Sequence, residues 1–315
     1  MAMTLAETAQ VTTEQRLPGV ISQLSVSNVL NRVPFEPIVG RAFSYNSEAT
    51  LPAAAFRAVN AGYTESTGTY TTATESLVIL GGEYAVDRFL ERTSAGTVAS
   101  LVAAQRDMKA RSIAAKFGDT FFNGSTGTDA NSFNGLKTRI TGGQVLSSGT
   151  NGAAMNTDDA TRRAFLDRLD ALVALVPGCN ALYASRPVLA MLRTVYRNMT
   201  IQNYTVDTLT GRPVEVPVWQ GIPILDAGLK ADQTAILPQT ETVGTSTNTS
   251  SIYAVNFSDS LDQPGITGLT NGGIQVDPPR ELETKPTILG RIEFYCGLAA
   301  MGSAPAARLT GVIAA

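Results

Sequence analysis

The sequence predicts an α+β fold, because strand-like and helix-like segments occupy separate stretches of its 315 residues. Three observations carry this prediction. A Thr- and Tyr-rich ribbon comes first and is followed by an unusually long amphipathic helix. Two shorter helices occupy the middle of the chain, and the C-terminal part returns to strands. With 43% hydrophobic residues the chain can form a real core, whereas only 16% are charged, which is typical of proteins that bury surface in an assembly.

The N-terminal part predicts an arm followed by a ribbon. Residues 1–30 are polar and rich in Thr, Gln and Ser, so we expect an arm that packs on something else. Residues 38–46 and 69–80 have strand composition, and the Ala-, Gly- and Thr-rich stretch 47–68 between them offers little for a core. An isolated two-stranded ribbon is marginal in water, so this one predicts packing against a neighbouring subunit.

Residues 94–122 predict the longest helix, with Ser94 as N-cap and Asn123-Gly124 as its end. It would span about 40 Å, which suits a spine crossing an elongated molecule. Its apolar positions recur at helical spacing: Val98, Leu101, Val102, Met108, Ile113, Phe117 and Phe121.

Two further helices flank a short strand in the middle of the chain. The first is expected over 157–176, with Thr157 as candidate cap and Pro177-Gly178 as its end. A strand at 181–184 follows, and Ser185 with Pro187 begins the second helix. The expected core positions are Phe165, Leu166, Leu169, Leu172, Val173 and Val176, then Val188, Leu189, Leu192, Val195 and Tyr196.

The rest of the chain predicts strands and one exposed polar loop at 239–251. The region from about 155 to 250 is expected to be compact, and the ribbon, the long helix and the C-terminal strands would form the remainder. The expected strands are 214–218, 222–225, 252–257, 274–276 and 288–299.

Composition excludes most enzyme chemistry. The chain has no His, which removes the commonest general base and metal ligand. It also has no phosphate-binding loop and no SxxK motif. Cys179 and Cys296 are expected to be buried free thiols in a reducing compartment. We therefore expect no enzymatic activity and no catalytic, cofactor-binding or metal-binding residues.

The remaining polar groups have structural explanations. Asp158 and Asp159 suit a helix N-terminus, and Glu281 with Glu283 lies in a Pro-rich, solvated connection. Arg291 and Glu293 are two residues apart on one strand and would share a face in a polar network. Trp219 is expected in the core.

Charge and hydropathy limit the partners. The net charge is −3 and no basic stripe is present, so contact with DNA should be weak and non-specific. We see no signal peptide and no apolar run of about 18 residues, so we expect no membrane partner and a protein made in a cytoplasm.

Three segments together resemble one known protein family. The first is KFGDTFFNG (116–124) with FNGL (133–136), similar to the signature at the end of the family's long helix. The second is VWQGIPILDAG (218–228). The third comprises IYAVNFSDS (252–260), GGIQVDPP (272–279) and KPTILGRIEFYCGLAAMGSAPAARLTGV (285–312). In this order the three segments resemble the Hong Kong 97-type major capsid proteins of tailed phages and the related encapsulin shells.

The resemblance implies an N-arm (1–37), an extended hairpin called the E-loop (38–82), a P-domain (83–154) with the spine helix, an A-domain (155–250) and returning P-domain strands (251–315). It also implies homo-hexamers and homo-pentamers in an icosahedral shell around double-stranded DNA. The localisation would be the virion, assembled in the cytoplasm of a bacterial host. Implied accessory partners are separate scaffolding, portal and cement or decoration proteins.

Two features modify this expectation. Some relatives cross-link a Lys of the E-loop to an Asn of another subunit, but the first lysine here is Lys109, so that cross-link should be absent. Only about 37 residues precede the E-loop, and Met1 favours a scaffold made as a separate protein over a mature, cleaved form.

Three alternatives remain open. An encapsulin-type shell around a cargo enzyme would share the fold, but residues 1–30 show no amphipathic cargo-docking helix. An enzyme using Asp and Glu in a cleft is disfavoured by the missing chemistry. A tail-tube or other β-rich virion protein fits poorly with three helices.

Overall fold

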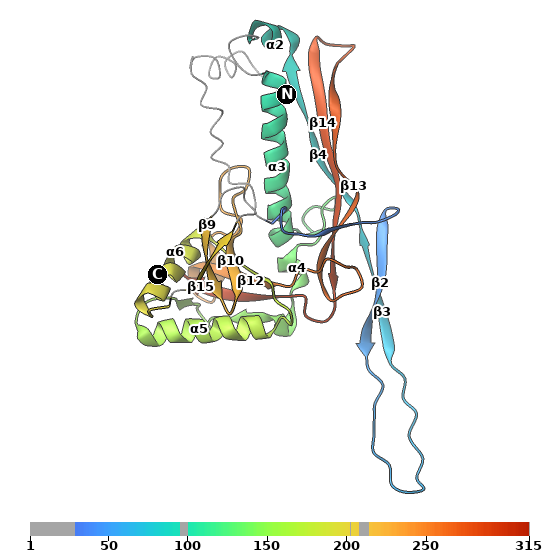
Figure 1. Cartoon of the computed structure of the whole chain (residues 1–315), viewed down its shortest axis with the longest axis vertical. Coiled ribbons are helices and arrows are strands. Elements are labelled where there is room, and N and C mark those ends of the chain that lie inside the picture. The colour runs from blue at the N-terminus through green and yellow to red at the C-terminus, as the bar shows by residue number, and fades with distance from the viewer. Residues whose placement is uncertain (1–28, 95–99, 202, 208–213, 315) are drawn as a thin grey trace.

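A four-stranded sheet in the order β1-β13-β14-β4 forms an upright lobe with α3 lying along it (Figure 1). The computed structural model describes residues 29–94, 100–201, 203–207 and 214–314. Residues 1–28, and with them most of the expected N-arm, lie outside the described residues. The elements of this lobe are β1 Phe35–Pro37, β4 Val78–Asp87, α2 Arg88–Ser94, α3 Leu101–Asn123, β13 Gly265–Glu281 and β14 Thr287–Met301.

The long helix begins later than the sequence predicts. Ser94 is the last residue of α2 and does not cap the long helix. The N-cap of α3 is Ser100, whose hydroxyl accepts a hydrogen bond from the backbone N–H of Ala103. The expected helix 94–122 is therefore two helices, with residues 95–99 outside the described part of the chain. The end at Asn123-Gly124 is as predicted.

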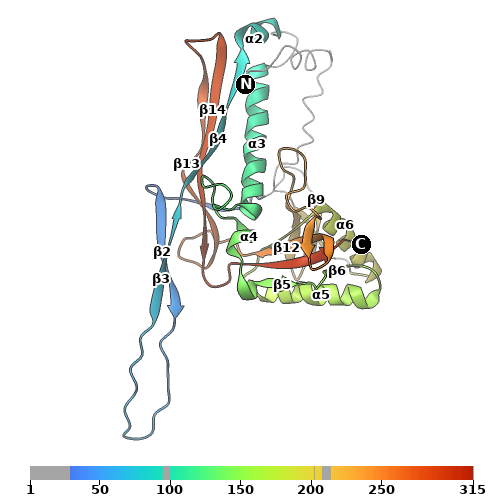
Figure 2. The same ribbon diagram turned by 180° about the vertical axis from the view of Figure 1, so that it is seen from behind.

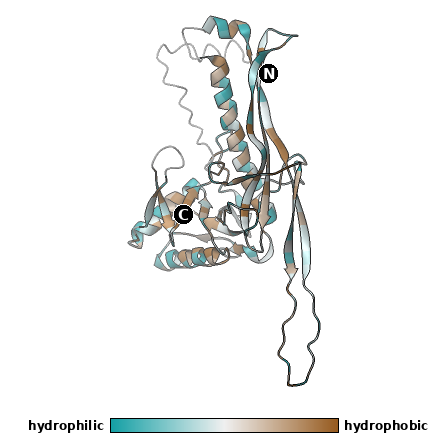
Figure 3. Ribbon diagram, turned by 45° about the vertical axis from the view of Figure 1, so that its right-hand side comes forward, coloured by the Kyte–Doolittle hydropathy of each residue, from teal (hydrophilic) through white to brown (hydrophobic). Residues whose placement is uncertain are grey.

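One face of α3 is buried along the sheet. Ile113 packs against the sheet residues Tyr84 and Ile292, and Phe117 packs against Phe294 at a ring distance of 6.1 Å. Met108 was expected on this face but is 49% exposed. In Figure 3, hydrophilic and hydrophobic bands alternate along α3, as expected for a helix that packs one side on the sheet and leaves the other side in solvent.

A nine-stranded sheet forms the second lobe, with the strand path β5-β15-β12-β7-β10-β9-β8; β11 pairs with β12 and β6 pairs with β15 beside this path. Its central strand β7 is buried along its whole length. Leu182 and Ala184 face the helices α5 and α6, and Ala181 and Tyr183 belong to the cluster around the C-terminal end of α3. The elements are α4 Leu136–Arg139, η1 Gly142–Gln144, β5 Val145–Ser147, β6 Ala153–Ala154, α5 Asp159–Ala174, β7 Ala181–Ala184, α6 Arg186–Asn198, β8 Tyr204–Asp207, β9 Val214–Trp219, β10 Ile222–Asp226, β11 Glu241–Val243, β12 Ser246–Val255 and β15 Ala306–Ile313.

The two middle helices follow the sequence closely. Ser185 is the N-cap of α6 and Pro187 lies in its first turn, as predicted. The cap of α5 is Asp158 and not Thr157, because the Asp158 carboxylate accepts the Thr161 backbone N–H at 2.7 Å. The expected apolar positions of both helices are buried or pack against the buried core.

The expectation of an exposed loop at 239–251 is wrong. This segment contains β11 and the start of β12, and Thr249, Ser250 and Ser251 are buried. The C-terminal strand β15 pairs with β12 in the nine-stranded sheet. A division of the chain between 250 and 251 therefore falls inside β12, and part of the segment 251–315 lies in the lobe that contains α5 and α6.

The ribbon is a two-stranded hairpin of β2, Ala42–Thr50, and β3, Thr69–Ser76. The first strand was expected over 38–46, but β2 begins at Ala42 and continues to Thr50. Ile38 instead packs in the small apolar cluster at the base of the hairpin. The expected second strand, 69–80, is β3 and the first residues of β4, separated by Leu77. Figures 1 and 2 show the hairpin projecting far from both lobes.

Candidate assembly surface

The outer part of the hairpin has no contact that would bury it. Residues 51–68, between β2 and β3, are exposed throughout. Burying one large apolar side chain is worth about 1.5–3 kcal/mol, so a surface that leaves several in water is suited to contact with another molecule. The large apolar side chains exposed on the hairpin are Leu51, Phe56, Val59, Tyr63 and Tyr70.

The turn at the tip is held by its own contacts. The Arg57 guanidinium lies 5.3 Å from the centre of the Tyr63 ring, and its Nη1 donates to the Ala61 carbonyl at 3.1 Å. Asn60 adopts a left-handed conformation with φ of 66° in the same turn. The neighbouring Phe56 is fully exposed beside this turn.

Side-chain hydrogen bonds cross between the two strands. The Ser44 and Thr74 hydroxyls are 2.8 Å apart, and Thr72 donates to the Asn46 side chain at 2.7 Å. The Thr50 and Thr69 hydroxyls meet at 2.7 Å where the strands end. These pairs use polar groups of the hairpin itself, so they stabilise its local shape without a partner.

The base of the hairpin is fixed to the body. The Glu75 carboxylate receives two bonds from the Arg139 guanidinium, at 2.5 and 2.7 Å. The Tyr45 hydroxyl donates to the Ala300 carbonyl at 2.8 Å, and burial and the Glu75 charge raise the pKa of that hydroxyl. Phe43 and Leu77 pack against a small apolar cluster on β13 and β14.

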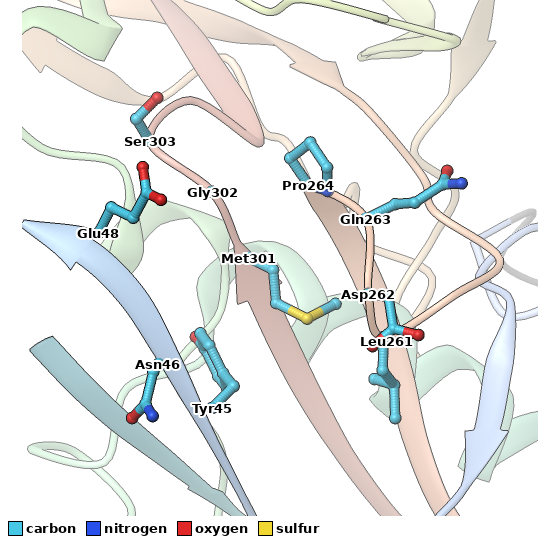
Figure 4. A pocket seen from close by; sticks show the side chains of 10 residues that line it. All are labelled: Tyr45, Asn46, Glu48, Leu261, Asp262, Gln263, Pro264, Met301, Gly302 and Ser303. Carbon is cyan, nitrogen blue, oxygen red and sulfur yellow. The ribbon is translucent and has the colours of Figure 1, made fainter. Parts of the chain in front are cut away.

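A groove of about 570 Å³ separates the hairpin from the body (Figure 4). Tyr45, Asn46 and Glu48 of β2 form one wall, and residues 261–264 form the other. Met301 points into the space between these walls, and Gly302 and Ser303 complete the lining. The hairpin therefore stands off the body beyond its anchored base.

A structural motif at the end of α3 places Arg139. The Gly135 N–H donates to the Gly124 carbonyl at 2.9 Å, and the Thr138 hydroxyl donates to the same carbonyl at 2.8 Å. A Cβ atom on Gly135 would lie 2.3 Å from the Thr120 carbonyl oxygen. Glycine is thus required where FNGL packs on the helix end, one turn before Arg139.

The remaining polar residues singled out in the sequence have structural partners. Arg291 pairs with Glu83 at 2.6 Å and lies 3.6 Å from Glu293, on the exposed side of the sheet. Glu281 at the end of β13 pairs with Arg88 at 2.8 Å, and Glu283 is exposed.

The tryptophan and the two cysteines that were expected in the core are buried or half-buried. The half-buried Trp219 donates its indole N–H to Asp170 at 2.7 Å. Both thiols are free; Cys296 is buried, and Cys179 is only half-buried. Burial raises the pKa of the Cys296 thiol to about 12.

Neither a metal centre nor a membrane span is evident in the part of the chain that the structure describes. No group of three or more Cys, Asp or Glu side chains is placed to hold a metal ion there. Likewise, none of the described helices has the length and hydropathy that crossing a bilayer requires.

Part of the chain, including the long helix and most of the hairpin, matches a known protein family. Residues 46–158, which include most of the hairpin and all of α3, match the family described as "Major capsid protein GP7". No curated protein sequence matches the chain.

Solved structures extend the likeness to the whole fold. The SrpI encapsulin of Synechococcus elongatus PCC 7942 has a TM-score of 0.70 at 13% identity, covering 100% of this chain and 97% of its own. The capsid of a native GTA particle has a TM-score of 0.65 at 15% identity, covering 95% and 94%. The Cyanophage A-1(L) capsid has a TM-score of 0.63 at 14% identity, covering 98% and 99%. The chain therefore has the Hong Kong 97-type fold, and residues 46–158 are similar to a major capsid protein family.

Proposed function

We propose that the chain assembles into hexamers and pentamers of an icosahedral shell that encloses double-stranded DNA. The observation that carries this proposal is the projecting hairpin, whose outer residues 51–68 are exposed and carry large apolar side chains. In a shell, each such hairpin would lie on a neighbouring copy and bury these side chains there. The role is structural and not catalytic.

In this proposal each part of the fold corresponds to one of the named parts of a Hong Kong 97-type capsid protein. The N-arm is 1–37 and the E-loop is 38–82, and the P-domain is built on α3 and the four-stranded sheet. The A-domain is the nine-stranded sheet with α5 and α6. In this proposal the A-domain would take in β5, β6, β15 and the end of β12 from outside the expected 155–250, because these strands pair in the nine-stranded sheet.

The shell is proposed to lack Lys–Asn cross-links, because no lysine precedes Lys109 and the hairpin therefore has none. Non-covalent contacts, with or without cement proteins, would hold the subunits together. Purified particles run on a denaturing gel should give monomers, and a covalent ladder would contradict this part of the proposal.

Assembly would take place in the cytoplasm of a bacterial host, with separate scaffolding and portal proteins. The net charge of −3 supports only weak, non-specific contact with the packaged DNA. The match to a phage capsid family favours a virion over the runner-up, an encapsulin-type compartment with a cargo enzyme.

Electron microscopy of the expressed protein tests the proposal. Closed icosahedral particles are expected, whereas a monodisperse monomer at high protein concentration, with and without a scaffolding partner, would contradict it. Particles isolated from the native source should contain nuclease-protected DNA. A specific cargo protein with no nucleic acid would instead support the encapsulin alternative.

A further inference from the structure

The hairpin is joined to the body by two narrow chain connections. Gly40, with φ of 97°, precedes β2, and a Cβ there would have no atom within 4 Å. On the other side, Leu77 is the single residue between β3 and β4. Such connections allow a two-stranded arm to change direction unless other contacts at its base prevent it.

Arg139 makes contacts that tie it to the body independently of the hairpin. Its Nε donates to the Asn134 carbonyl at 2.7 Å, and its Nη2 donates to the Leu298 carbonyl at 3.0 Å. Asn134 belongs to the loop that packs on the end of α3, and Leu298 belongs to β14. The guanidinium is therefore oriented by the body before the hairpin contributes anything.

Glu75 is the hairpin's contribution to the same contact. Its two carboxylate oxygens meet Nη1 and Nη2 of Arg139 in a bidentate arrangement, which constrains direction as well as distance. The two side chains are only 20% and 17% exposed, so solvent competes less with this pair than with a surface ion pair.

We infer that Arg139 and Glu75 are a positioning pair that fixes the angle at which the hairpin leaves the body. Arg139 connects the hairpin to the end of α3, because the Gly135 N–H and the Thr138 hydroxyl both donate to the Gly124 carbonyl at that helix end. The consequence for shell formation rests on the proposed function: a hairpin at the wrong angle would miss its neighbour even though its tip is unchanged.

The hairpin angle can be measured directly in unassembled protein. Spin labels on Ala49→Cys in β2 and Asp167→Cys in α5 report the distance between arm and body. Both sites are exposed. Cys179→Ser removes the half-buried thiol, and the buried Cys296 can stay.

Glu75→Gln and Arg139→Gln should each broaden this distance distribution and speed amide exchange at the hairpin base by roughly tenfold, as expected for a lost bond between charged groups. The double variant should be no worse than Arg139→Gln alone, because that single variant has already lost the interaction with Glu75. Arg139→Lys keeps the charge but loses the fork, so it should fold and give intermediate broadening.

Glu65→Gln is the matched control, since it removes the same charge from the exposed tip of the same hairpin. It should leave the distance and the exchange rates unchanged. A loss of global stability alone would lower the Tm without broadening the distance in folded protein. Wild-type-like distances and exchange rates in Glu75→Gln and Arg139→Lys would overturn the inference.

Shell formation is scored separately by sedimentation of the same variants. Failure of the wild-type chain to form shells would count against the proposed function and leave the distance result standing. Normal shell yield from every variant at Glu75 and Arg139 would overturn the assembly role of the pair.

Discussion

Gly135→Ala tests whether the loop on the end of α3 is a close-packed structural element. A Cβ at this position would lie 2.3 Å from the Thr120 oxygen, 2.7 Å from the Gly124 nitrogen and 2.8 Å from the Phe121 oxygen. All three are backbone atoms, so no side-chain rotation relieves the clash. The loop must move away from the helix end, and its bonds to the Gly124 carbonyl lengthen or break.

The magnitude follows from three contributions. Two hydrogen bonds are worth about 1 kcal/mol each. Overpacking against a rigid neighbour costs about 1–3 kcal/mol. Alanine also restricts the unfolded chain more than glycine does, which offsets about 0.4–1 kcal/mol of this loss. The offset applies because Gly135 has an extended backbone with φ of −82°, which alanine adopts without strain. The net loss is roughly 2–4 kcal/mol, which at about 2 cal/mol/K per residue lowers the Tm by about 3–6 °C.

Thermal and urea unfolding of the unassembled chain, followed by circular dichroism, measures this loss. Gly143→Ala is the matched control, because a Cβ there has no atom within 4 Å and its φ is not positive. The control should be as stable as the wild type or slightly more so. If Gly135→Ala came within about 0.5 kcal/mol of the wild type, the close-packing argument would be refuted.

Three further predictions concern the tip, the thiols and a helix cap. Phe56→Ala should leave the Tm of the unassembled chain unchanged but raise the critical concentration for assembly measured by light scattering, because its ring is exposed in the isolated chain. A thiol reagent at pH 8 should modify Cys179 before Cys296 in folded protein. Burial raises the pKa of both thiols, but Cys179 is only half-buried, whereas Cys296 is fully buried and its pKa is raised to about 12. Hydrogen bonds from Thr161 lower the pKa of Asp158 below its usual 3.8. The ionised Asp158 carboxylate therefore stabilises α5 above pH 3.8, and this stabilisation is lost as the pH falls through the folded-state pKa. Asp158→Ala should lower the free energy of unfolding at pH 7 and make it depend less on pH in acid.

Local signals in the sequence predicted the helices well. The Ser185 and Pro187 start of α6 depends on the geometry of one helical turn, which neighbouring residues specify. The periodic apolar residues of α5 and α6 were likewise found in the core. Ser94 failed as a cap because two serines stand near the start of the long helix, and only the folded chain shows that Ser100 faces an open N–H.

Contacts between distant residues could not be predicted. Thr249, Ser250 and Ser251 have the composition of a loop, yet they are buried in a central strand. Their polarity is satisfied from far along the chain: Ser251 donates to Glu241, and Arg308 donates to both residues. The Arg139–Glu75 pair was missed for the same reason, since no local pattern relates residues in a hairpin and in a short helix.

The charges of the hairpin indicate which forces assembly would use. Over 42–76 the residues charged at neutral pH are Glu48, Arg57, Glu65 and Glu75. Two of them already have partners within the chain, since Arg57 contacts Tyr63 and Glu75 pairs with Arg139. Contacts made by the tip would therefore depend mainly on apolar burial, which salt does not screen and which strengthens on warming from the cold. The critical concentration for assembly through the hairpin should then change less than about threefold between roughly 0.05 and 0.5 M NaCl, and should fall between about 5 and 30 °C. A steep rise in critical concentration with salt would instead mean that charged groups outside the hairpin dominate the subunit contacts.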